Sequence, residues 1–297
     1  MVTKISIIIP TRDRQKQIIS LLESIKQLKG LERLGPEIIV GDNASKDQTW
    51  ERLQQIIEDY PVPLRLFQVI SPGKCRVLNE AMGLARGDIF VFLDDDVLVE
   101  PGWLAAIENH FGQFPSLAAQ GAIRIPAEDI ADPEIRRLIE RYRTVRQLDF
   151  DGSSCEMHSL NGANMAFRRE VFDKVGNFDT RLGPGASGTS EDTELAQRIL
   201  RAGINIAYMK KAIVYHQLDR PRLTEDYFKH VHRRQGASRL LFKHQSVVRI
   251  IFDLCRVSAQ YGFHSIFGGE RKLYRSKGRI YHYLGMLESK RKRDNWE

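Results

Sequence analysis

Short apolar runs alternate with amphipathic stretches through the first hundred residues, and this alternation restricts the fold more than any other feature of the chain. The apolar runs lie at 5–9, 37–41, 64–70 and 89–93. Between them apolar residues recur at helical spacing, as Ile18, Leu21 and Ile25 do in the first stretch. Four strands joined by three helical crossovers are therefore expected. This predicts the α/β class, with a mostly parallel sheet flanked by helices.

The alternation loosens beyond residue 101, where the predicted elements are more varied. They are a charged helix, a glycine-rich segment, a second helix and two short strands, at 136–148, 182–189, 190–202, 204–209 and 212–215. His216 follows the last of these strands directly. From residue 224 onward the pattern is helical and basic, so we expect a helical appendage at the C-terminal end.

Charge is distributed unevenly along the chain. Residues 1–228 carry 29 Lys and Arg against 33 Asp and Glu, a net charge of −4. Residues 229–297 carry 16 against 5, a net charge of +11. The acidic front argues against nucleic acid as a partner of the main domain, and the basic tail indicates an anionic partner.

The tail has one dense apolar run, at 247–257, which Arg249, Asp253 and Arg256 interrupt. It is too short for the roughly twenty apolar residues that a bilayer-spanning helix needs. Basic and aromatic residues together suit peripheral contact with an anionic membrane, which would bring the site to a lipid-linked acceptor. A packed helical appendage with a solvated basic face explains the same pattern equally well.

The cysteines and the first residues indicate the compartment. Cys75, Cys155 and Cys255 are far apart and in no metal-binding spacing, so we expect free thiols in a reducing environment. Residues 1–6 lead into the first strand without the features of a signal peptide. A cytoplasmic protein is therefore expected, with the inner face of the cell membrane as its place if the tail binds lipid.

Polar residues follow each predicted strand, at the sheet edge where ligands of open α/β sheets bind. The four segments are Pro10-Thr11-Arg12-Asp13, Asp42-Asn43, Ser71-Pro72-Gly73-Lys74 and Asp94-Asp95-Asp96. One edge of the sheet therefore gathers cations and carboxylates.

Three consecutive acids, Asp94, Asp95 and Asp96, end an apolar strand. Like charges held this close repel one another unless a cation lies between them. Oxygen ligands suit Mg²⁺ or Mn²⁺, which usually complete their coordination with substrate phosphates. An acidic turn that caps the next helix is the alternative interpretation.

Two further candidates each have a structural interpretation beside the functional one. Ser190, Glu191 and Asp192 open a predicted helix, where a serine cap followed by acids is as ordinary as a catalytic pair. His216 at a strand end is either a structural histidine or a ligand for a manganese-like ion.

Several common enzyme classes lack their motifs in this chain. Lys74 after Gly73 is a candidate partner for a diphosphate, but Cys75 follows it, which excludes a P-loop. No dinucleotide-binding glycine pattern follows the first strand, and no Gly-Xaa-Ser-Xaa-Gly elbow occurs. Nicotinamide-dependent dehydrogenases and α/β-hydrolases are therefore disfavoured.

These segments, in this order, resemble the family-2 glycosyltransferases of the GT-A fold from about Ile5 to His216. The segments that carry the resemblance are 6–11, 40–47, 73–74, 78–79, 94–96, 161–168 and 191–192. Two turns depart from the family pattern. Residues 10–14 read Pro-Thr-Arg-Asp-Arg where an aromatic residue and Asn are frequent, and Leu78 stands where an Arg often precedes the equivalent of Asn79.

The resemblance implies a role for residues at each strand end. Contacts with the nucleotide are expected from Pro10, Thr11, Arg12, Asp42, Lys74, Asn79, Asp94 and Asp95. Asp96 is expected to hold the metal with His216, and Asp192 to act as the catalytic base. The residues expected beside the donor and acceptor sugars are Gly162, Asn164 and Glu191.

The activity implied is transfer of a sugar from a nucleoside-diphosphate sugar, with a UDP-sugar favoured, to a hydroxyl of a glycan or lipid-linked saccharide. A divalent metal, Mn²⁺ or Mg²⁺, would assist a single displacement with inversion. The implied domains are a glycosyltransferase domain at 1–222, divided at about residue 100 into nucleotide-binding and acceptor-binding halves, and a basic helical region at 223–297. The alternatives are a sugar nucleotidyltransferase and a non-catalytic module that binds polysaccharide or other anions.

Overall fold

The computed structural model describes residues 4–150 and 156–294, the last three without their side chains. In this part of the chain the strands form one eight-stranded sheet in the order β3-β2-β1-β4-β7-β6-β8-β5. The strands are β1 (Ile5–Thr11), β2 (Glu37–Asp42), β3 (Leu64–Gln68), β4 (Ile89–Phe92), β5 (Val97–Val99), β6 (Ala118–Arg124), β7 (Met165–Arg168) and β8 (Ile206–His216). The predicted α/β class and parallel first half are confirmed, because β1 pairs in parallel with both β2 and β4.

Helices connect and flank the strands. They are α1 (Gln15–Lys26), α2 (Leu31–Leu34), α3 (Thr49–Ile56), α4 (Lys74–Leu84), α5 (Trp103–Gln113), α6 (Ala127–Ala131), α7 (Pro133–Tyr142), α8 (Glu170–Val175), α9 (Glu191–Arg201), the 3-10 helix η1 (Arg220–Leu223), α10 (Glu225–Arg239), α11 (Val247–Phe267) and α12 (Glu270–Asp294). The expected C-terminal helices are thus present. No helix of the described residues is both long and apolar enough to cross a membrane.

The described residues group into two compact units. The first contains the residues up to Pro126 with Gln147–Thr180 and Glu191–Gln217, and the second contains Ala127–Arg146, Arg181–Ser190 and the chain from Leu218 onward. Two segments that precede residue 222 therefore belong to the same unit as the C-terminal helices. The division into functional domains at that residue stays a prediction.

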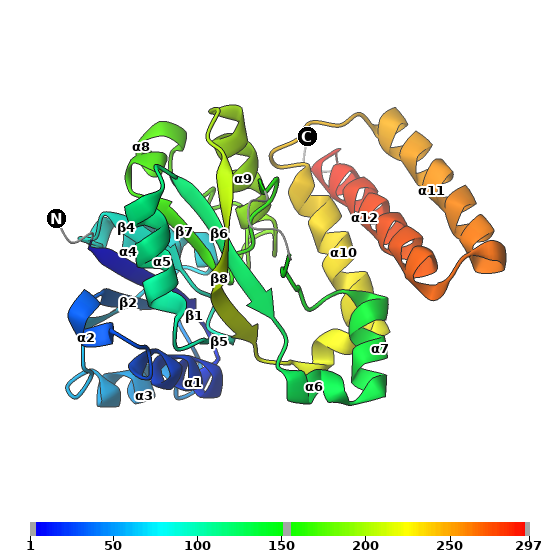
Figure 1. The fold of residues 1–297 in the computed structure, drawn as a ribbon. Helices are drawn as coiled ribbons and strands as arrows, with labels where there is room; N and C mark the ends of the chain where they lie inside the picture. The colour runs from blue at the N-terminus through cyan, green and yellow to red at the C-terminus, as the bar shows by residue number, and fades with distance from the viewer. Residues whose placement is uncertain (1–3, 151–155, 295–297) are drawn as a thin grey trace. The chain divides into compact units, whose positions relative to one another are not determined.

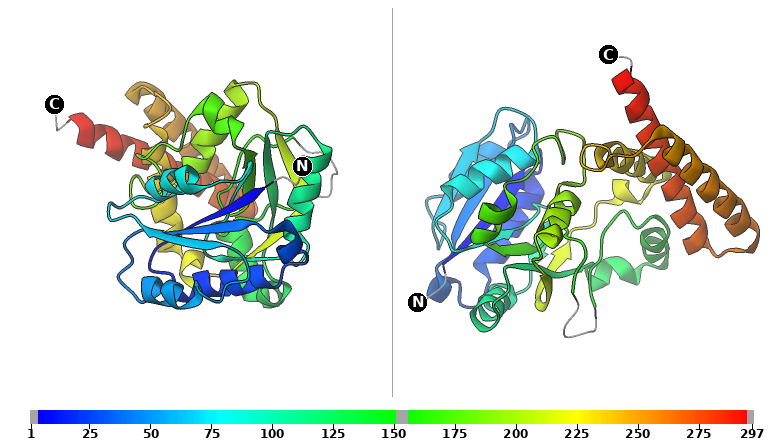
Figure 2. Two further views of the ribbon diagram at one scale, coloured as in Figure 1. Left: turned by 90° about the vertical axis from the view of Figure 1, so that its left-hand side faces the viewer. Right: turned by 90° about the horizontal axis from the view of Figure 1, so that it is seen from above.

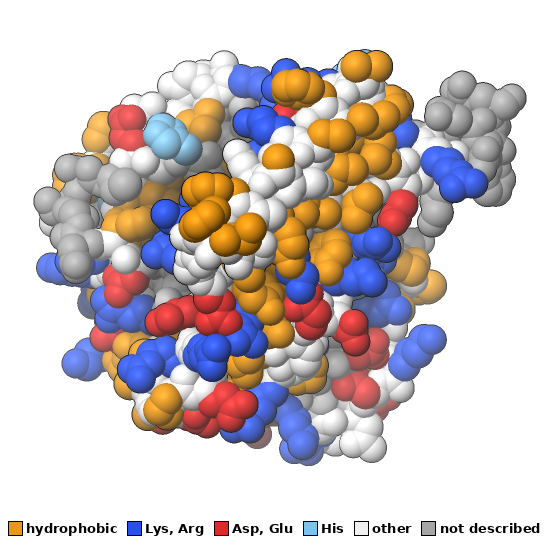
Figure 3. Space-filling view, turned by 90° about the vertical axis from the view of Figure 1, so that its right-hand side faces the viewer, with side chains coloured by type: hydrophobic (Ala, Val, Ile, Leu, Met, Phe, Trp, Pro, Cys, Tyr) orange, Lys and Arg blue, Asp and Glu red, His pale blue; other side chains and the backbone are white. Residues whose placement is uncertain are grey.

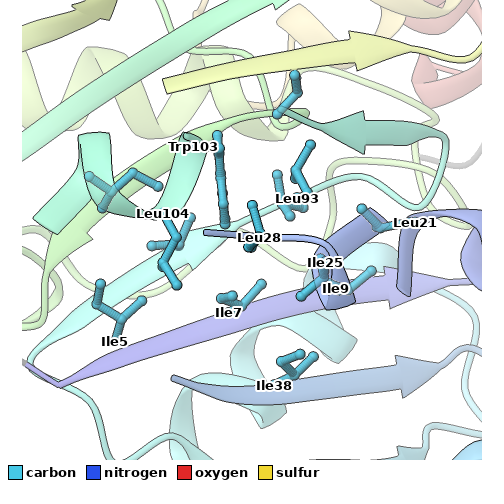
Figure 4. Close-up of a cluster of buried hydrophobic side chains, with 14 of the residues drawn as sticks. Ile5, Ile7, Ile9, Leu21, Ile25, Leu28, Ile38, Leu93, Trp103 and Leu104 are labelled. Atoms are coloured by element: carbon cyan, nitrogen blue, oxygen red, sulfur yellow. The ribbon is translucent and has the colours of Figure 1, made fainter. Parts of the chain in front are cut away.

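The core of the first unit lies on both faces of the sheet. Side chains alternate along β1, so Ile7 and Ile9 face α1 and α5 whereas Ile8 faces the cluster that contains α4 and α9 residues. Figure 4 shows Ile9 beside Ile25 of α1, and Ile7 beside Leu28. The central strands β1 and β4 are buried on both sides, which explains their nearly continuous apolar runs.

Strand β8 corrects one prediction. Two strands were expected, separated at the exposed Lys210 and Lys211, but β8 is a single strand of 11 residues. Its pairing with β6 shifts register between Gly121 and Ala122, so an irregularity takes up Lys210, Lys211 and Ala212 without ending the strand.

The charged helix predicted at 136–148 has different bounds. Asp132 caps α7, its carboxylate accepting a hydrogen bond from the Glu134 backbone N at 2.9 Å, and Pro133 occupies the first turn. The helix ends at Tyr142, because Arg143 adopts the left-handed conformation with φ of 53°. Leu148 is not helical but exchanges backbone hydrogen bonds with Ile123.

In the second unit α10, α11 and α12 lie side by side (Figures 1 and 2). Two glycines allow α10 and α12 to approach closely. A side chain at Gly236 would collide with the His282 carbonyl, and one at Gly285 with the Arg233 carbonyl. The pair of contacts is reciprocal and brings the two backbones together.

The cysteines are consistent with free thiols where the structure describes them. Cys75 is buried and Cys255 is exposed, and neither forms a disulfide. Cys155 and residues 1–3 lie outside the described residues, so expectations about them stay predictions.

Candidate functional site

The turns after β1 and β2 are joined by hydrogen bonds. The Asp13 carboxylate accepts a bond from the Lys46 backbone N at 2.6 Å, and the Asp13 backbone N donates to the Ser45 hydroxyl at 2.9 Å. Asp13 has a left-handed φ of 51°, a conformation that Asp tolerates better than most residues. Arg12 lies in the same turn, and its Nε is 3.4 Å from the Asp13 carboxylate. Pro10 is buried within β1, opposite Gly41.

Asn43 organises the turn that leads to Lys74, a role that the sequence analysis did not identify. Its buried amide donates to the carbonyls of Val69 and Ser71 at 3.1 and 3.0 Å. Its side-chain oxygen accepts a bond from the Gly73 backbone N at 2.8 Å. Asn43 therefore fixes the start of α4. Its place directly after a strand is the sequence feature from which this role could have been inferred.

Asp42 is fully buried at the end of β2. Its carboxylate accepts hydrogen bonds from the Ser45 backbone N at 3.2 Å and from the Gln68 side chain at 2.9 Å, with a further short bond from the Ser45 hydroxyl. The structure thus holds Asp42 rigidly beside β3. Its contact with a nucleotide stays a prediction.

Lys74 is the centre of an ionic cluster at the start of α4. Its Nζ lies 2.5 Å from Asp94 Oδ1 and 3.1 Å from Glu191 Oε1, and Glu191 is the first residue of α9. Burial lowers the pKa of Lys74, but the charges of Asp94, Glu191 and Asp192 outweigh it and raise this pKa well above its ordinary value. Lys74 therefore carries a permanent positive charge.

Gly162 lies against this cluster. A Cβ at that position would be 2.9 Å from Lys74 Nζ and 3.5 Å from Asp94 Oδ1. Any side chain there would displace the lysine tip. The structure thus brings Gly162 to the same place as Glu191, as expected for two residues assigned to one site, although contact with sugars is untested.

The three consecutive aspartates point to three different partners. Asp94 contacts Lys74, and the Asp95 carboxylate accepts a hydrogen bond from the Thr11 hydroxyl at 2.8 Å. Burial and then the charge of Asp96 raise the pKa of Asp95 to about 7. Asp95 therefore fixes the ends of β1 and β4 to each other, with Thr11 as its partner.

Asp96 meets His216 through the pairing of β5 with β8. Val97 pairs with His216, and the Gln217 backbone N donates to the Asp96 carbonyl at 2.8 Å. As a result, His216 Nε2 lies 3.8 Å from Asp96 Oδ1. Both side chains are buried.

Arg14 adds a cation that the sequence analysis did not select. Its Nη1 lies 3.4 Å from Asp96 Oδ2, and the side chain is about one quarter exposed. The sequence feature that could have identified Arg14 is the pair of arginines that follows the first strand. A guanidinium at this place suits binding of a phosphate.

The donor set of Asp96 and His216 suits a divalent ion. The two donor atoms are closer than twice the bond of about 2.1 Å that Mg²⁺ forms, so one ion can bind both. Within residues 4–150 and 156–294 no group of three or more His, Cys, Asp or Glu is arranged to hold a metal. An ion here would therefore take its remaining ligands from substrate or water, as Mg²⁺ commonly does.

Asp192 is the second residue of α9 and half-buried. One of its carboxylate oxygens accepts hydrogen bonds from the Thr193 backbone N at 2.6 Å and from the Thr193 hydroxyl at 3.2 Å. The preceding Ser190 has a left-handed φ of 78°. Asp192 is near enough to raise the pKa of Lys74, and its role as a base stays a prediction.

Asn164, expected beside the donor or acceptor sugar, has three hydrogen-bond partners within the chain, and its contact with a sugar stays a prediction. Its buried side chain accepts a hydrogen bond from Trp103 Nε1 at 3.0 Å and donates to the carbonyls of Ala122 and Ala212 at 2.9 and 2.8 Å. The amide thus ties α5, β6 and β8 together. A buried polar group with satisfied hydrogen bonds explains this residue without a sugar.

The Asn79 side chain also forms hydrogen bonds within the chain. Its amide donates to the Phe178 carbonyl at 2.9 Å and accepts from the Phe178 backbone N at 3.0 Å. This paired contact fixes the segment after α8 against α4. The contact of Asn79 with a nucleotide stays a prediction.

Comparison with known proteins identifies the family of the chain. A family model described as "Glycosyl transferase family 2" matches residues 6–176. The chain is 27% identical over 150 residues to the glucosyl-dolichyl phosphate glucuronosyltransferase of Haloferax volcanii, and the match covers 48% of this chain and 47% of that protein. The chain thus spans about half the length of this curated relative.

Solved structures share the fold. A mannosyltransferase from Pyrobaculum calidifontis in complex with GDP-Man and Mn²⁺ has a TM-score of 0.63 at 18% identity, covering 97% of this chain and 87% of that one. S. aureus TarS 1-349 in complex with UDP-GlcNAc has a TM-score of 0.57 at 18% identity, covering 97% and 92%. These neighbours confirm the expected GT-A fold. Because the family match covers more than half of the sequence, the chain belongs to glycosyl transferase family 2.

Proposed function

We propose that the chain transfers a sugar from a nucleoside-diphosphate sugar to an acceptor hydroxyl by a metal-assisted single displacement with inversion. The observation that carries the proposal is the divergence of the three aspartates after β4. Asp94 contacts a permanent cation, Lys74, and Asp96 lies beside His216 in a two-donor set suited to a divalent ion. A positive side chain and a metal position thus flank one strand end, the place where a ligand of such a sheet binds.

The departing nucleoside diphosphate gains negative charge as the bond from the anomeric carbon to its phosphate oxygen breaks. Lys74 would stabilise that charge, and Arg14 supplies a second cation nearby. A divalent ion held by Asp96 and His216 would act as a Lewis acid on the diphosphate. Because these charges are fixed before the reaction, they stabilise the transition state more than the neutral bond of the substrate.

The acceptor hydroxyl must lose a proton as its oxygen bonds to the anomeric carbon. We assign this proton to the Asp192 carboxylate. The support for this assignment is that Asp192 follows Glu191, which contacts Lys74. One displacement without a covalent enzyme intermediate inverts the anomeric centre.

We favour a UDP-sugar as donor and a glycan or lipid-linked saccharide as acceptor. The UDP-GlcNAc complex of S. aureus TarS supports this donor class, whereas GDP-Man in the P. calidifontis enzyme makes GDP the second candidate. The name of the H. volcanii relative, which specifies a dolichyl phosphate, supports a lipid-linked acceptor. Action on the cytoplasmic side, with peripheral contact to an anionic membrane, is part of this proposal. Mn²⁺ is the ion to test first, because it is present in the P. calidifontis complex.

Thermal melting of the purified chain tests the donor site, because a ligand that binds only the folded state raises the melting temperature. UDP, GDP, CDP and dTDP are each compared with and without Mn²⁺. We expect a manganese-dependent rise with one nucleotide that is lost in Asp96→Ala and kept in Asp59→Ala, an exposed control. If no nucleotide raises the melting temperature, the proposed function is wrong.

The same purified chain tests the assignment of Asp192 as the catalytic base. Asp192→Asn should keep the nucleotide-dependent rise but lose sugar transfer by at least about a hundredfold. Equal transfer by Asp192→Asn and the unaltered chain would remove Asp192 from the mechanism. A chain that binds a nucleotide sugar and transfers nothing to any acceptor would favour the non-catalytic alternative.

A further inference from the structure

Helix α11 leaves large apolar side chains uncovered along its length. Among its 21 residues only Ile250, Asp253 and Val257 are buried. The exposed apolar side chains form two groups, one in the first turns of α11 and one in its last turns, and both point away from the buried side of the helix. They are Val247, Val248, Ile251, Phe252, Phe263, Ile266 and Phe267. Figure 3 shows hydrophobic side chains gathered on the upper part of the surface that carries this helix.

The opposite face of α11 already has its partners. Ile250 packs with Leu240 and Met286 in the small core of the second unit. The buried Asp253 is bound by Arg249 at 3.0 Å and by Arg256 at 2.9 Å. The exposed apolar face is therefore not needed to attach α11 to its unit.

Two phenylalanines and an isoleucine are exposed where α11 turns back into α12. We call Phe263, Ile266 and Phe267 the apolar tip; they are 59%, 73% and 73% exposed. The rings of Phe263 and Phe267 are 5.2 Å apart. The His264 ring contacts the Ser276 hydroxyl at 2.8 Å, so the tip lies beside the first turns of α12.

Exposed basic side chains surround the tip. Arg271, Lys272 and Arg275 lie in the first turns of α12. Helix α7 packs against the same turns, with the rings of Tyr142 and Tyr274 5.5 Å apart, and this contact adds Arg143 to the group.

The basic group has no counter-charge of its own. Glu270, the acid nearest to it in sequence, is bound by Arg137 and Arg141. Among the described residues, Arg143, Arg271 and Arg275 have no acidic partner. Burial and then the charges of neighbouring arginines lower the pKa of Arg143, which agrees with unneutralised positive charge at this place.

We propose that the apolar tip and its basic surround dock on an anionic phospholipid surface. Apolar side chains would enter the boundary between headgroups and acyl chains, and the arginines and lysine would bind lipid phosphates. The net charge of +11 on residues 229–297 favours this partner over a second copy, since two copies would bring like charges together. The surface would serve the proposed transfer to a lipid-linked acceptor, but lipid binding itself does not depend on catalysis.

Flotation of the full chain with vesicles tests the proposal. Vesicles of phosphatidylcholine alone are compared with vesicles that also contain phosphatidylglycerol, each at low and high salt. The chain should float with the anionic vesicles at low salt. The triple variant Phe263→Ser, Ile266→Ser, Phe267→Ser should lose at least about tenfold in partition coefficient. Phe114→Ser, which removes an exposed phenylalanine at the end of α5, should float like the unaltered chain.

A second variant separates charge from apolar contact. Arg271→Gln with Arg275→Gln should lower partition onto anionic vesicles about fivefold for each arginine and leave the weak partition onto neutral vesicles unchanged. Equal flotation of the triple variant and the unaltered chain would overturn the proposal, as would failure of the unaltered chain to bind anionic vesicles. A dimer in light scattering that the triple variant abolishes would instead identify the tip as an interface between copies. Melting with nucleotide and Mn²⁺ is measured in parallel, so failure of lipid binding is distinguishable from failure of the proposed function.

Discussion

Lys74 and Glu191 are the first residues of two different helices, and their charged groups lie 3.1 Å apart. Asp94, at the end of β4, approaches the same ammonium group to 2.5 Å. The start of α4, the start of α9 and the end of β4 therefore depend on one cation. Its removal would leave two carboxylates close together in a poorly solvated place, which is unfavourable for both.

Replacement of this cation tests both stability and catalysis. Lys74→Met should lower the free energy of unfolding by about 2 kcal/mol, because the two carboxylates lose their partner. It should also lower kcat/KM at least about a hundredfold, because the departing diphosphate loses a positive group. Urea denaturation and a transfer assay measure the two effects. Lys29→Met, which changes an exposed lysine, is the control, and equal stability of the two variants would contradict the ionic role of Lys74.

Gly162 offers a milder perturbation of the same cluster. Gly162→Ala places a methyl group 2.9 Å from Lys74 Nζ, so the flexible lysine tip must move while the fold is retained. We expect kcat/KM to fall about tenfold or more with little change in melting temperature. Gly112→Ala is the matched control, since its added Cβ meets nothing within 4 Å beyond its chain neighbours and the backbone of its own helix. The assignment of the Lys74 cluster to the site fails if both variants keep full activity.

The first half of the sheet could be predicted from the sequence because its signals are local. The strands from β1 to β4 lie in mostly apolar segments, and each intervening helix has its own apolar spacing. The second half is different, because β7 pairs antiparallel to β4 and β8 pairs with both β6 and β5. No local pattern encodes those distant pairings, and the approach of His216 to Asp96 follows from one of them.

The candidate site likewise contains residues that could be predicted from the sequence and residues that could not. The strand-end residues Lys74, Asp94 and Asp96 were identified because position and charge are visible in a sequence. Asn164 has the residue type of a ligand, but its burial among three hydrogen-bond partners became visible only in the structure. Arg14 was not selected because its approach to Asp96 depends on the path of the turn after β1. The catalytic roles stay predictions until the variants are measured.

The role of Asn164 as a structural residue can be measured directly. Asn164→Leu leaves the Trp103 N–H and two backbone carbonyls without their partner, so unfolding should become easier by about 3 kcal/mol. Asn205→Ala removes an exposed hydrogen bond to Glu156 and should change the free energy of unfolding by less than about 0.5 kcal/mol. Urea denaturation compares the two. A stable Asn164→Leu that only loses affinity for the donor would restore the sugar-binding interpretation.

Two histidines of the second unit make its stability depend on pH. His232 packs edge-on against Phe228, with ring centroids 4.5 Å apart. Burial lowers the pKa of His232 to about 4, and the charge of Arg146 acts in the same direction. A hydrogen bond with the Gln235 side chain acts against this shift. Burial likewise lowers the pKa of His282 to about 4, with the charges of Arg239, His232 and Arg279 contributing. Both histidines are therefore neutral in the folded chain at neutral pH.

In the unfolded chain these histidines have pKa values of about 6.5, so between about pH 4 and pH 6.5 the unfolded state binds more protons than the folded state. The free energy of unfolding must then fall as the pH is lowered from about 7 to about 5, by roughly 1–2 kcal/mol for each histidine. Urea denaturation at the two pH values measures the fall. His232→Gln with His282→Gln should make the profile flatter, whereas His244→Gln, which alters an exposed histidine, should leave it unchanged. An identical fall in the double variant and the unaltered chain would show that other groups bind the protons, because neither glutamine can titrate.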